Sequence, residues 1–376
     1  MPAVPYGQGS AFVRENLATD VLTAAKERIA GLCREFDTLV VSFSAGKDST
    51  TVKELTREVT ASLGKPMVLL YCDEELIDPD TTAYAERVWA RCQHDPGYGH
   101  VTMRWVCAPI RHTLRSDHRA VWYPWDPDEQ HVWFRAMPLQ GESHESLSKT
   151  ATKGELHFDL VNRILFPKKQ YGKVCQISGV RAHEGVNRLR DIMNAGSYIT
   201  RKGQQHYAKP IFDWTTTDVW MAIALFKWDY SQVYEKLRAM GISPHKQRVA
   251  PWGNVAASRE TRIWSEIYPD AWEKALLRLP ELKAQARYGN TKLYRKGIAK
   301  PAGLTWQDWC MQLLGAMDAE RKAFWEDEIA GSLRRWTRVY TVPFPEEPIP
   351  NTKNQSWKQL AYRMSKNDAM PRDRVA

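Results

Sequence analysis

A short stretch of small and polar residues, 44 to 49, holds the groups of this chain best suited to bind an anion. An apolar run with β-branched residues, 38 to 43, precedes it and predicts a buried parallel strand. Asp48, Ser49 and Thr50 are favoured at helix N-termini, so the spacing predicts a helix that continues to about residue 63. The stretch is therefore predicted to connect a strand to a helix.

Such a connection can bind phosphate, because unpaired N–H groups and the helix dipole converge at the helix N-terminus. Lys47 adds a positive charge there, and Ser44 and Ser49 add hydroxyl groups. The G-x-x-x-x-G-K-[ST] spacing of a Walker A loop is absent. The alternative is an ordinary strand-to-helix turn that contains a lysine by chance.

A second candidate segment, residues 179 to 188, follows a predicted strand at 174 to 178. Arg181 lies just after that strand, and Arg188 lies one to two turns into the next helix. A guanidinium group can hold a phosphate or sulfate through two hydrogen bonds, so both arginines are candidates for substrate binding. The alternative is that Arg181 pairs locally with Glu184.

Two acidic residues, Asp73 and Glu74, follow another predicted strand, 67 to 72. They are candidates to bind magnesium, the ribose or the activated substrate, and the alternative is a solvated loop start. Asp48 and Asp73 are the predicted magnesium ligands. No zinc is predicted, because the scattered histidines form no metal-binding spacing: His112, His118, His183 and His245.

Strands and helices alternate in the first part of the chain. A helical apolar stripe spans 21 to 36, and further strands are predicted at 101 to 107 and 207 to 212, with a helix at 81 to 92. This alternation predicts an α/β fold with a mostly parallel sheet and helices on both faces. Ligands bind such sheets beyond the carboxyl ends of the strands, where all the motifs above lie.

The predicted organisation has three parts. Residues 1–228 form the α/β domain, with an insertion at about 110–170. Residues 229–340 form a helical C-terminal region, in which a helical block spans about 305 to 330. Residues 341–376 form a proline-rich extended segment and a basic tail.

The motifs resemble a known superfamily. Residues 44–49, Ser-Ala-Gly-Lys-Asp-Ser, resemble the S-G-G-x-D-S pyrophosphate loop of ATP pyrophosphatases and of the sulfonucleotide (PAPS) reductase family, with Ala45 at the first glycine. Residues 179–188 resemble that family's G-V-R-x-x-E-(x)n-R element, and residues 209–220 its P-I-x-x-W-x-x-x-D-V-W segment. The resemblance implies a Rossmann-like, HUP-type fold of the adenine nucleotide α-hydrolase kind.

A closer resemblance extends further along the chain. Residues 73–75, 123–126 and 241–248 are similar to an uncharacterised branch typified by immunoglobulin-binding regulator A proteins of bacteria and phages. The resemblance to this branch implies no particular biochemical activity.

The expected site residues follow from these motifs. Nucleotide or pyrophosphate binding is expected of Ser42, Phe43, Ser44, Ala45, Gly46, Lys47, Asp48, Ser49, Asp73 and Gly179. Substrate binding is expected of Arg111, Arg181, His183, Glu184 and Arg188. Catalytic roles are expected of Lys47, Asp48 and Arg181.

The implied function is adenylation of a substrate by ATP, or another use of PAPS, with pyrophosphate release and Mg²⁺ as cofactor. One alternative is a sulfonucleotide reductase or sulfotransferase, and another is a nucleotide-sensing regulator without turnover. Reduction is disfavoured, because the E-C-G-L-H tail of the reductases is absent and no cysteine follows Cys310. The paired cysteines of an Fe–S cluster are missing as well. Cys310 is interpreted as a buried structural thiol, and no cysteine is expected to take part in catalysis; Cys72 and Cys107 are the only plausible replacements.

The composition limits the partners and the cellular location that we expect for this protein. The 376 residues carry a formal charge of +9, which suits a polyanion such as nucleic acid, although a mildly basic protein without such a partner fits equally. No apolar run of about 20 residues, no signal-peptide pattern and no C-x-x-C pair is present, so we expect a cytoplasmic protein without disulfides or membrane spans. A nucleotide is the expected substrate. The sequence is compatible with a nucleic-acid or protein partner and with a homo-oligomer.

Overall fold

The computed structural model describes residues 18–113, 121–147, 164–202, 205–253, 261–288, 300–349 and 355–365. The described residues form two compact units. One runs from residue 18 to 112 and from 121 to 283, and the other is formed mainly by residues from 284 to 365. Parts of the predicted insertion and the basic tail after residue 365 lie outside the described residues.

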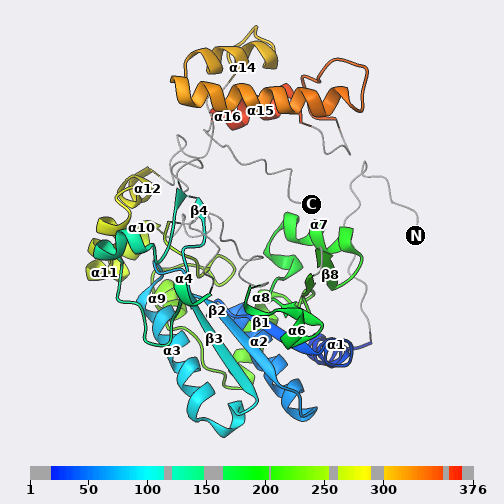
Figure 1. Cartoon of the computed structure of the whole chain (residues 1–376), viewed down its shortest axis with the longest axis vertical. Coiled ribbons are helices and arrows are strands. Elements are labelled where there is room, and N and C mark those ends of the chain that lie inside the picture. The colour runs from blue at the N-terminus through cyan, green and yellow to red at the C-terminus, as the bar shows by residue number, and fades with distance from the viewer. Residues whose placement is uncertain are drawn as a thin grey trace. The chain divides into compact units, whose positions relative to one another are not determined.

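The first unit (Figure 1) is built on a seven-stranded sheet. The order of its strands is β6-β3-β2-β1-β7-β9-β8. Neighbouring strands are parallel, except for the antiparallel pair β8–β9. A separate pair joins β4 and β5. The strands are β1 Thr38–Ser42, β2 Met67–Cys72, β3 Val101–Cys107, β4 His112–Thr113, β5 Val121–Trp122, β6 Glu142–Ser143, β7 Val174–Ile177, β8 Ile199–Lys202 and β9 Gln205–Ala208.

Both faces of this sheet are covered. Alternate residues of β1, such as Leu39 and Val41, pack in one core with α1, α2, α3 and α8. Val40 packs in a second core on the opposite face, with Leu165 and Phe166 from the end of the insertion. The predicted fold class, a mostly parallel sheet between helices followed by a helical region, is confirmed.

The helices begin where capping residues stand. Asp20 accepts hydrogen bonds from the first turn of α1, Asp78 and Pro79 begin α3, and Thr215 and Asp218 cap α8 reciprocally. The helices of this unit are α1 Val21–Glu35, α2 Lys47–Ser62, α3 Pro79–His94, η1 Pro96–Tyr98, η2 Pro127–Val132, α4 His144–Leu147, α6 Lys168–Tyr171, η3 Ala182–Glu184, α7 Val186–Ala195, α8 Thr216–Leu225, α9 Val233–Ala239, α10 Thr261–Ile267, α11 Pro269–Arg278 and α12 Leu282–Tyr288, the last of which continues into the second unit.

The predicted strand at 207–212 is only partly correct. β9 ends at Ala208, because the chain turns at Pro210, which has no N–H for a ladder, and Phe212 donates its N–H to Lys209 within that turn. The sequence did not indicate β8, the antiparallel edge strand that pairs with β9.

The second unit is helical. Its helices are α14 Trp306–Gly315, α15 Ala319–Thr337 and α16 Trp357–Ser365. Their core is rich in tryptophan, with Trp309, Trp325 and Trp357 buried around Leu360. The helical block predicted at about 305 to 330 corresponds to α14 and α15, and α15 extends further. None of the helices in the described part of the chain combines the length and the apolar character that crossing a membrane requires.

The strand order also indicates where a ligand-binding crevice should form. From β1 the chain proceeds to β2 and β3 on one side, and it later returns to β7 and β9 on the other side. The direction of winding therefore reverses between β1 and β7. In open α/β sheets a crevice for ligands forms at such a reversal, beyond the carboxyl ends of the two strands.

Candidate functional site

A cavity of about 400 Å³ lies at this reversal, between the loops that follow β1 and β7. Most of the predicted site residues line it: Ser42, Ser44, Gly46, Lys47, Asp48, Ser49, Gly179, Arg181, His183, Glu184 and Arg188. Four others do not line it: Phe43, Ala45, Asp73 and Arg111. Phe43 and Ala45 are buried within the loop itself, and Arg111 is exposed to solvent.

The loop after β1 is held by its own side chains. The Ser49 hydroxyl donates to the Gly46 carbonyl at 2.9 Å, and its oxygen accepts the N–H of Ser44 at 3.2 Å. Ala45 takes a left-handed backbone conformation with φ of 58°. This conformation is one that glycine adopts freely, which agrees with the glycine that stands there in the S-G-G-x-D-S pattern.

The N-terminus of α2 presents free donors. The first helical hydrogen bond runs from Thr50 to Gly46, and the N-cap residue Gly46 has no side chain that could cap the helix. Within the part of the chain that the structure describes, the N–H groups of Asp48 and Ser49 have no hydrogen-bond acceptor. A Cβ at Gly179 would lie 2.6 Å from the Asp48 carbonyl, so only glycine lets the loop after β7 pack against this turn. The arrangement fits an anion such as phosphate.

Three charged side chains form a chain along the cavity wall. Lys47 Nζ lies 3.2 Å from Asp48 Oδ2, and Arg181 Nε lies 2.7 Å from Asp48 Oδ1. Lys47 is 5% exposed and Arg181 is 2% exposed. Two buried cations with one carboxylate leave a net positive charge beside the cavity, which adds to the attraction for an anion.

The local pairing of Arg181 with Glu184 takes a different form from the one expected. The Glu184 carboxylate accepts the backbone N–H of Arg181 at 2.9 Å, while the guanidinium reaches Asp48 and lies near the Trp214 carbonyl and the Thr216 hydroxyl. The guanidinium of Arg181 therefore ties the loop after β7 to the first turn of α2.

Most of the lining residues that sequence reasoning missed come from α9 and the segment after it. The Tyr234 hydroxyl accepts the backbone N–H of Lys47 at 2.8 Å, and the Gln247 carbonyl accepts from Lys47 Nζ at 3.2 Å. His245 and Arg248 line the same cavity. Residues 241–248 carried a signal only through the family resemblance, and Tyr234 carried none.

A second hollow of about 310 Å³ adjoins the cavity through shared residues. It is lined by residues 184–188, from η3 into the first turn of α7, and by Arg248. Arg248 donates to the Glu184 carbonyl at 3.2 Å, and Arg188 is exposed. This side of the site is therefore polar, open and rich in arginine.

Asp73 is placed away from the cavity wall. It is 2% exposed, and its carboxylate accepts from Trp105 Nε1 at 2.8 Å and from Arg135. Asp73 is thus neither a solvated loop start nor a lining residue. Its predicted role as a nucleotide or magnesium ligand stays a prediction.

The neighbouring Glu75 stabilises the insertion through hydrogen bonds. Its carboxylate accepts the backbone N–H groups of Trp125 at 2.7 Å and Phe134 at 2.8 Å, and it is paired with Arg278 of α11 at 2.8 Å. Arg278 also donates to the Tyr123 carbonyl. The similarity over residues 73–75 and 123–126 therefore coincides with a buried structural network.

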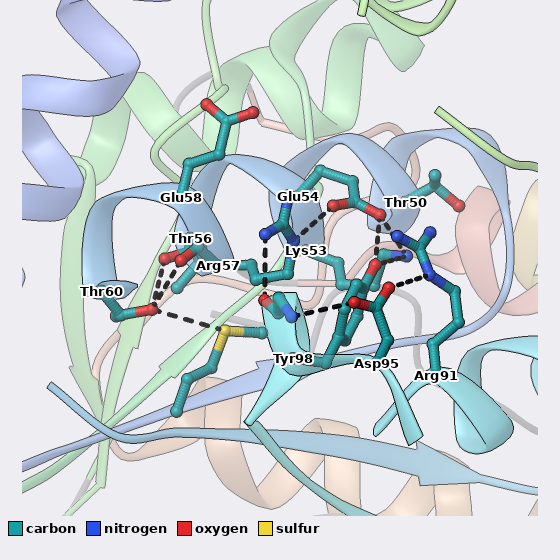
Figure 2. Close-up of polar contacts among 12 residues, drawn as sticks. Thr50, Lys53, Glu54, Thr56, Arg57, Glu58, Thr60, Arg91, Asp95 and Tyr98 are labelled. Atoms are coloured by element: carbon teal, nitrogen blue, oxygen red, sulfur yellow. Dashed lines mark hydrogen bonds and ion pairs between the residues drawn. The ribbon is translucent and has the colours of Figure 1, made fainter. Parts of the chain in front are cut away.

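A buried ion pair anchors α2 behind the site (Figure 2). Lys53 is fully buried, with Nζ 2.7 Å from Glu54 Oε1. Glu54 also accepts from the Tyr98 hydroxyl at 2.6 Å and from Arg57 at 2.7 Å. Burial would raise the pKa of Glu54, but the Lys53 charge and these hydrogen bonds lower it to about 2. The helix that carries the loop is thereby fixed to η1.

No thiol of the described chain is activated. Burial, aided by nearby carboxylates, raises the pKa of Cys72 to about 12, and burial raises the pKa of Cys310 to about 12. Burial also raises the pKa of Cys107. None of the three lines the cavity. Cys310 is buried in the core of the second unit, as the sequence indicated.

Metal ligands are sparse among the described residues. No group of three or more His, Cys, Asp or Glu side chains lies there in a position to hold a metal ion. The carboxylates that line the cavity are Asp48 and Glu184. Such a site suits a magnesium ion held mainly by substrate phosphates and by one carboxylate.

Comparisons with known proteins give a limited identification. A family model described as a domain of unknown function (DUF3440) matches residues 241–365. The uncharacterized protein YbdN of Escherichia coli (strain K12) is 24% identical over 370 residues, which are 94% of this chain and 89% of that protein. Neither comparison names an activity.

Two solved structures are similar at a low level. One is phosphoadenylyl-sulfate (PAPS) reductase from Candida auris in a phosphate complex, with a TM-score of 0.34 and 14% identity over 61% of this chain and 88% of that chain. The other is the U34-tRNA thiolase NcsA from Methanococcus maripaludis with its 4Fe–4S cluster, with a TM-score of 0.34 and 10% identity over 71% and 80% of the two chains. At these TM-scores the fold class rests on the strand order of this chain itself.

Proposed function

We propose that this protein binds an adenine nucleotide, ATP or PAPS, at the cavity between β1 and β7, and that it uses ATP to adenylate a substrate. The observation that carries this proposal is the pair of free N–H groups, Asp48 and Ser49, in the first turn of α2 beside the buried Lys47–Asp48–Arg181 chain, which leaves a net positive charge at the cavity wall. A cavity of about 400 Å³ lies within the ordinary range for small-molecule ligands.

The proposed reaction begins when a substrate oxygen attacks the α-phosphorus of ATP. The bond from the α-phosphorus to the bridging oxygen breaks, and pyrophosphate leaves with the electron pair. Lys47 and the free N–H groups in the first turn of α2 would stabilise the charge that develops on the leaving oxygens. The adenylated substrate then accepts a nitrogen or sulfur nucleophile and releases AMP.

Arg181 has a positioning role in this proposal. Its guanidinium orients Asp48 at 2.7 Å and thereby fixes the first turn of α2. Magnesium bound to the phosphates would neutralise charge during transfer, with Asp48 as the protein ligand best placed to contact it. The carboxylate of Asp48 would then exchange part of its contact with Lys47 for the metal.

The substrate is proposed to enter over the arginine-rich hollow, where Arg188 and Arg248 can contact an anion. Together with the formal charge of +9, this favours a nucleic acid as the molecule to be modified. Reduction of a sulfonucleotide is less well supported, because it requires an accessible thiolate, and no cysteine is among the residues that line the cavity.

The experiment is to incubate the protein with labelled ATP, PAPS and adenylyl sulfate, with and without RNA and DNA, and to measure binding and pyrophosphate release. Lys47→Ala should weaken nucleotide binding about 10-fold or more, since it removes a charge-assisted contact. Lys26→Ala is the matched control, because Lys26 pairs with Glu58 on the half-exposed surface.

The outcomes separate the alternatives. Pyrophosphate release that depends on RNA or DNA supports adenylation of a nucleic acid. Binding without any release supports a sensor. If wild-type protein and Lys47→Ala bind all three nucleotides equally, or if neither binds any, the proposed function is wrong.

A further inference from the structure

The hydroxyl of Tyr234 contacts the first turn of α2 at the cavity, although Tyr234 comes from a helix far away in the sequence. Tyr234 belongs to α9, is 2% exposed and lines the cavity. Its oxygen accepts the backbone N–H of Lys47 at 2.8 Å. This N–H is one of the donors at the N-terminus of α2 that a phosphate would otherwise contact directly.

A phenol both accepts and donates hydrogen bonds. The acceptor function of Tyr234 is used by Lys47, but its proton has no acceptor within the described part of the chain. Burial and the nearby Asp48 charge raise the pKa of Tyr234, so the hydroxyl keeps its proton at neutral pH. A buried donor without an acceptor is costly, and an anionic ligand in the cavity would supply one.

The surroundings hold the hydroxyl in place. The ring packs edge-to-face on Trp220 at 5.2 Å, and Lys47 Nζ lies 5.6 Å from the ring centre. A Cβ at Gly46 would lie only 3.3 Å from the hydroxyl oxygen, so the loop glycine leaves the room that this approach requires. The tyrosine and the glycine therefore fit each other.

We propose that Tyr234 is a phosphate-binding residue that donates its O–H to a phosphate oxygen of the bound nucleotide. The inference rests on the proposed function and adds a residue to the same site. Lys47 N–H, the Tyr234 hydroxyl and the phosphate oxygen form a chain of hydrogen bonds, in which each bond polarises the next. Helix α9 thereby contributes directly to a site whose other lining residues come from the loops after β1 and β7, from Thr216 and from residues 245–249.

The test compares Tyr234→Phe with wild type by calorimetric titration with ATP, inorganic pyrophosphate and adenosine. Loss of a hydrogen bond to a charged acceptor should weaken ATP and pyrophosphate binding about 10-fold or more. Any affinity for adenosine should stay unchanged, because adenosine has no phosphate. Tyr230→Phe is the matched control, since its hydroxyl contacts Glu235 and Tyr230 does not line the cavity.

Three results would overturn the inference. Unchanged ATP and pyrophosphate affinities would show that Tyr234 only packs. Tighter binding by Tyr234→Phe would show that the hydroxyl competes with phosphate for the Lys47 N–H. Equal weakening of all three ligands would indicate a general structural effect. The ligand-induced rise in Tm, measured from each variant's own ligand-free Tm, gives the same comparison if Tyr234→Phe is less stable. If wild type binds none of the three ligands, the proposed function fails together with the inference, whereas loss of the inference alone leaves wild-type binding intact.

Discussion

Substitutions in the buried pair Lys53–Glu54 should have unequal effects, because the two charges have different numbers of partners. Lys53 has one anionic partner, Glu54, at 2.7 Å. Glu54 has two further partners, Arg57 and the Tyr98 hydroxyl. Glu54→Gln therefore leaves a fully buried lysine without an anion, whereas Lys53→Met leaves a carboxylate that is still paired.

The size of the effect follows from this asymmetry. Removing one partner of a buried pair costs about 3–5 kcal/mol. An unpaired Lys53 can instead lose its proton, and moving from its ordinary pKa of 10.5 to neutral pH costs at most about 5 kcal/mol. We expect the free energy of unfolding to fall by about 3–5 kcal/mol for Glu54→Gln and by about 1–2 kcal/mol for Lys53→Met. Total stabilities are only about 5–15 kcal/mol, so the difference is large.

Urea denaturation from pH 4 to pH 10 measures the free energy of unfolding of the wild type, Glu54→Gln and Lys53→Met. In wild type the depressed pKa of Glu54 stabilises the fold above pH 4.5, and this contribution is lost as pH falls toward 2. In Glu54→Gln the unpaired Lys53 should have a lowered pKa, so the unfolded state binds more protons and stability should rise toward pH 10. Equal destabilisation by the two substitutions, or no such rise for Glu54→Gln, would refute this reasoning.

Three other predictions concern the site and its neighbourhood. Arg181→Lys keeps the charge but loses the planar group that contacts Asp48, so nucleotide-dependent turnover should fall at least about 10-fold; full activity would contradict the positioning role. Burial and the adjacent Asp73 raise the pKa of Glu74 to about 8, so its folded carboxyl keeps a proton that the unfolded chain has lost, and stability should decrease from pH 4.5 to 8. Glu74→Gln should accordingly raise Tm at pH 8 and change it little at pH 4.5; equal shifts at both values would exclude this explanation. Replacing Cys72 and Cys107 together with alanine should leave turnover largely intact, and lost turnover with intact ATP binding and Tm would restore a redox mechanism.

Local patterns were sufficient for much of the fold. The apolar runs predicted β2 and β3 with their observed bounds. The small residues between an apolar run and favoured helix N-terminal residues predicted the loop at the start of α2. The family pattern has glycine at the position of Ala45, and the left-handed backbone there agrees with that residue. These features depend on neighbouring residues, and sequence patterns report such features well.

Contacts between distant segments could not be predicted in the same way. Tyr234 is 187 residues from its partner Lys47, and a tyrosine in a short helix is as typical of a core as of a site. Asp73 and Glu75 have the residue types of metal ligands, but packing pairs their carboxylates with the distant Arg135 and Arg278. The type of a residue limits what it can bind, while its partner is decided by packing.

The burial of Lys47 and Arg181 has a consequence for how salt should act on this protein. Dissolved ions screen charges on a surface over about 8–10 Å at moderate ionic strength, but they screen buried charges much less. A nucleic acid on the exposed arginines would be released steeply as salt rises, because its binding displaces condensed counterions. A nucleotide bound in the cavity, as we propose, would lie beside cations that are 5% and 2% exposed, so it should stay bound over the same range. If both proposed ligands bind, raising the ionic strength should therefore release the nucleic acid before the nucleotide.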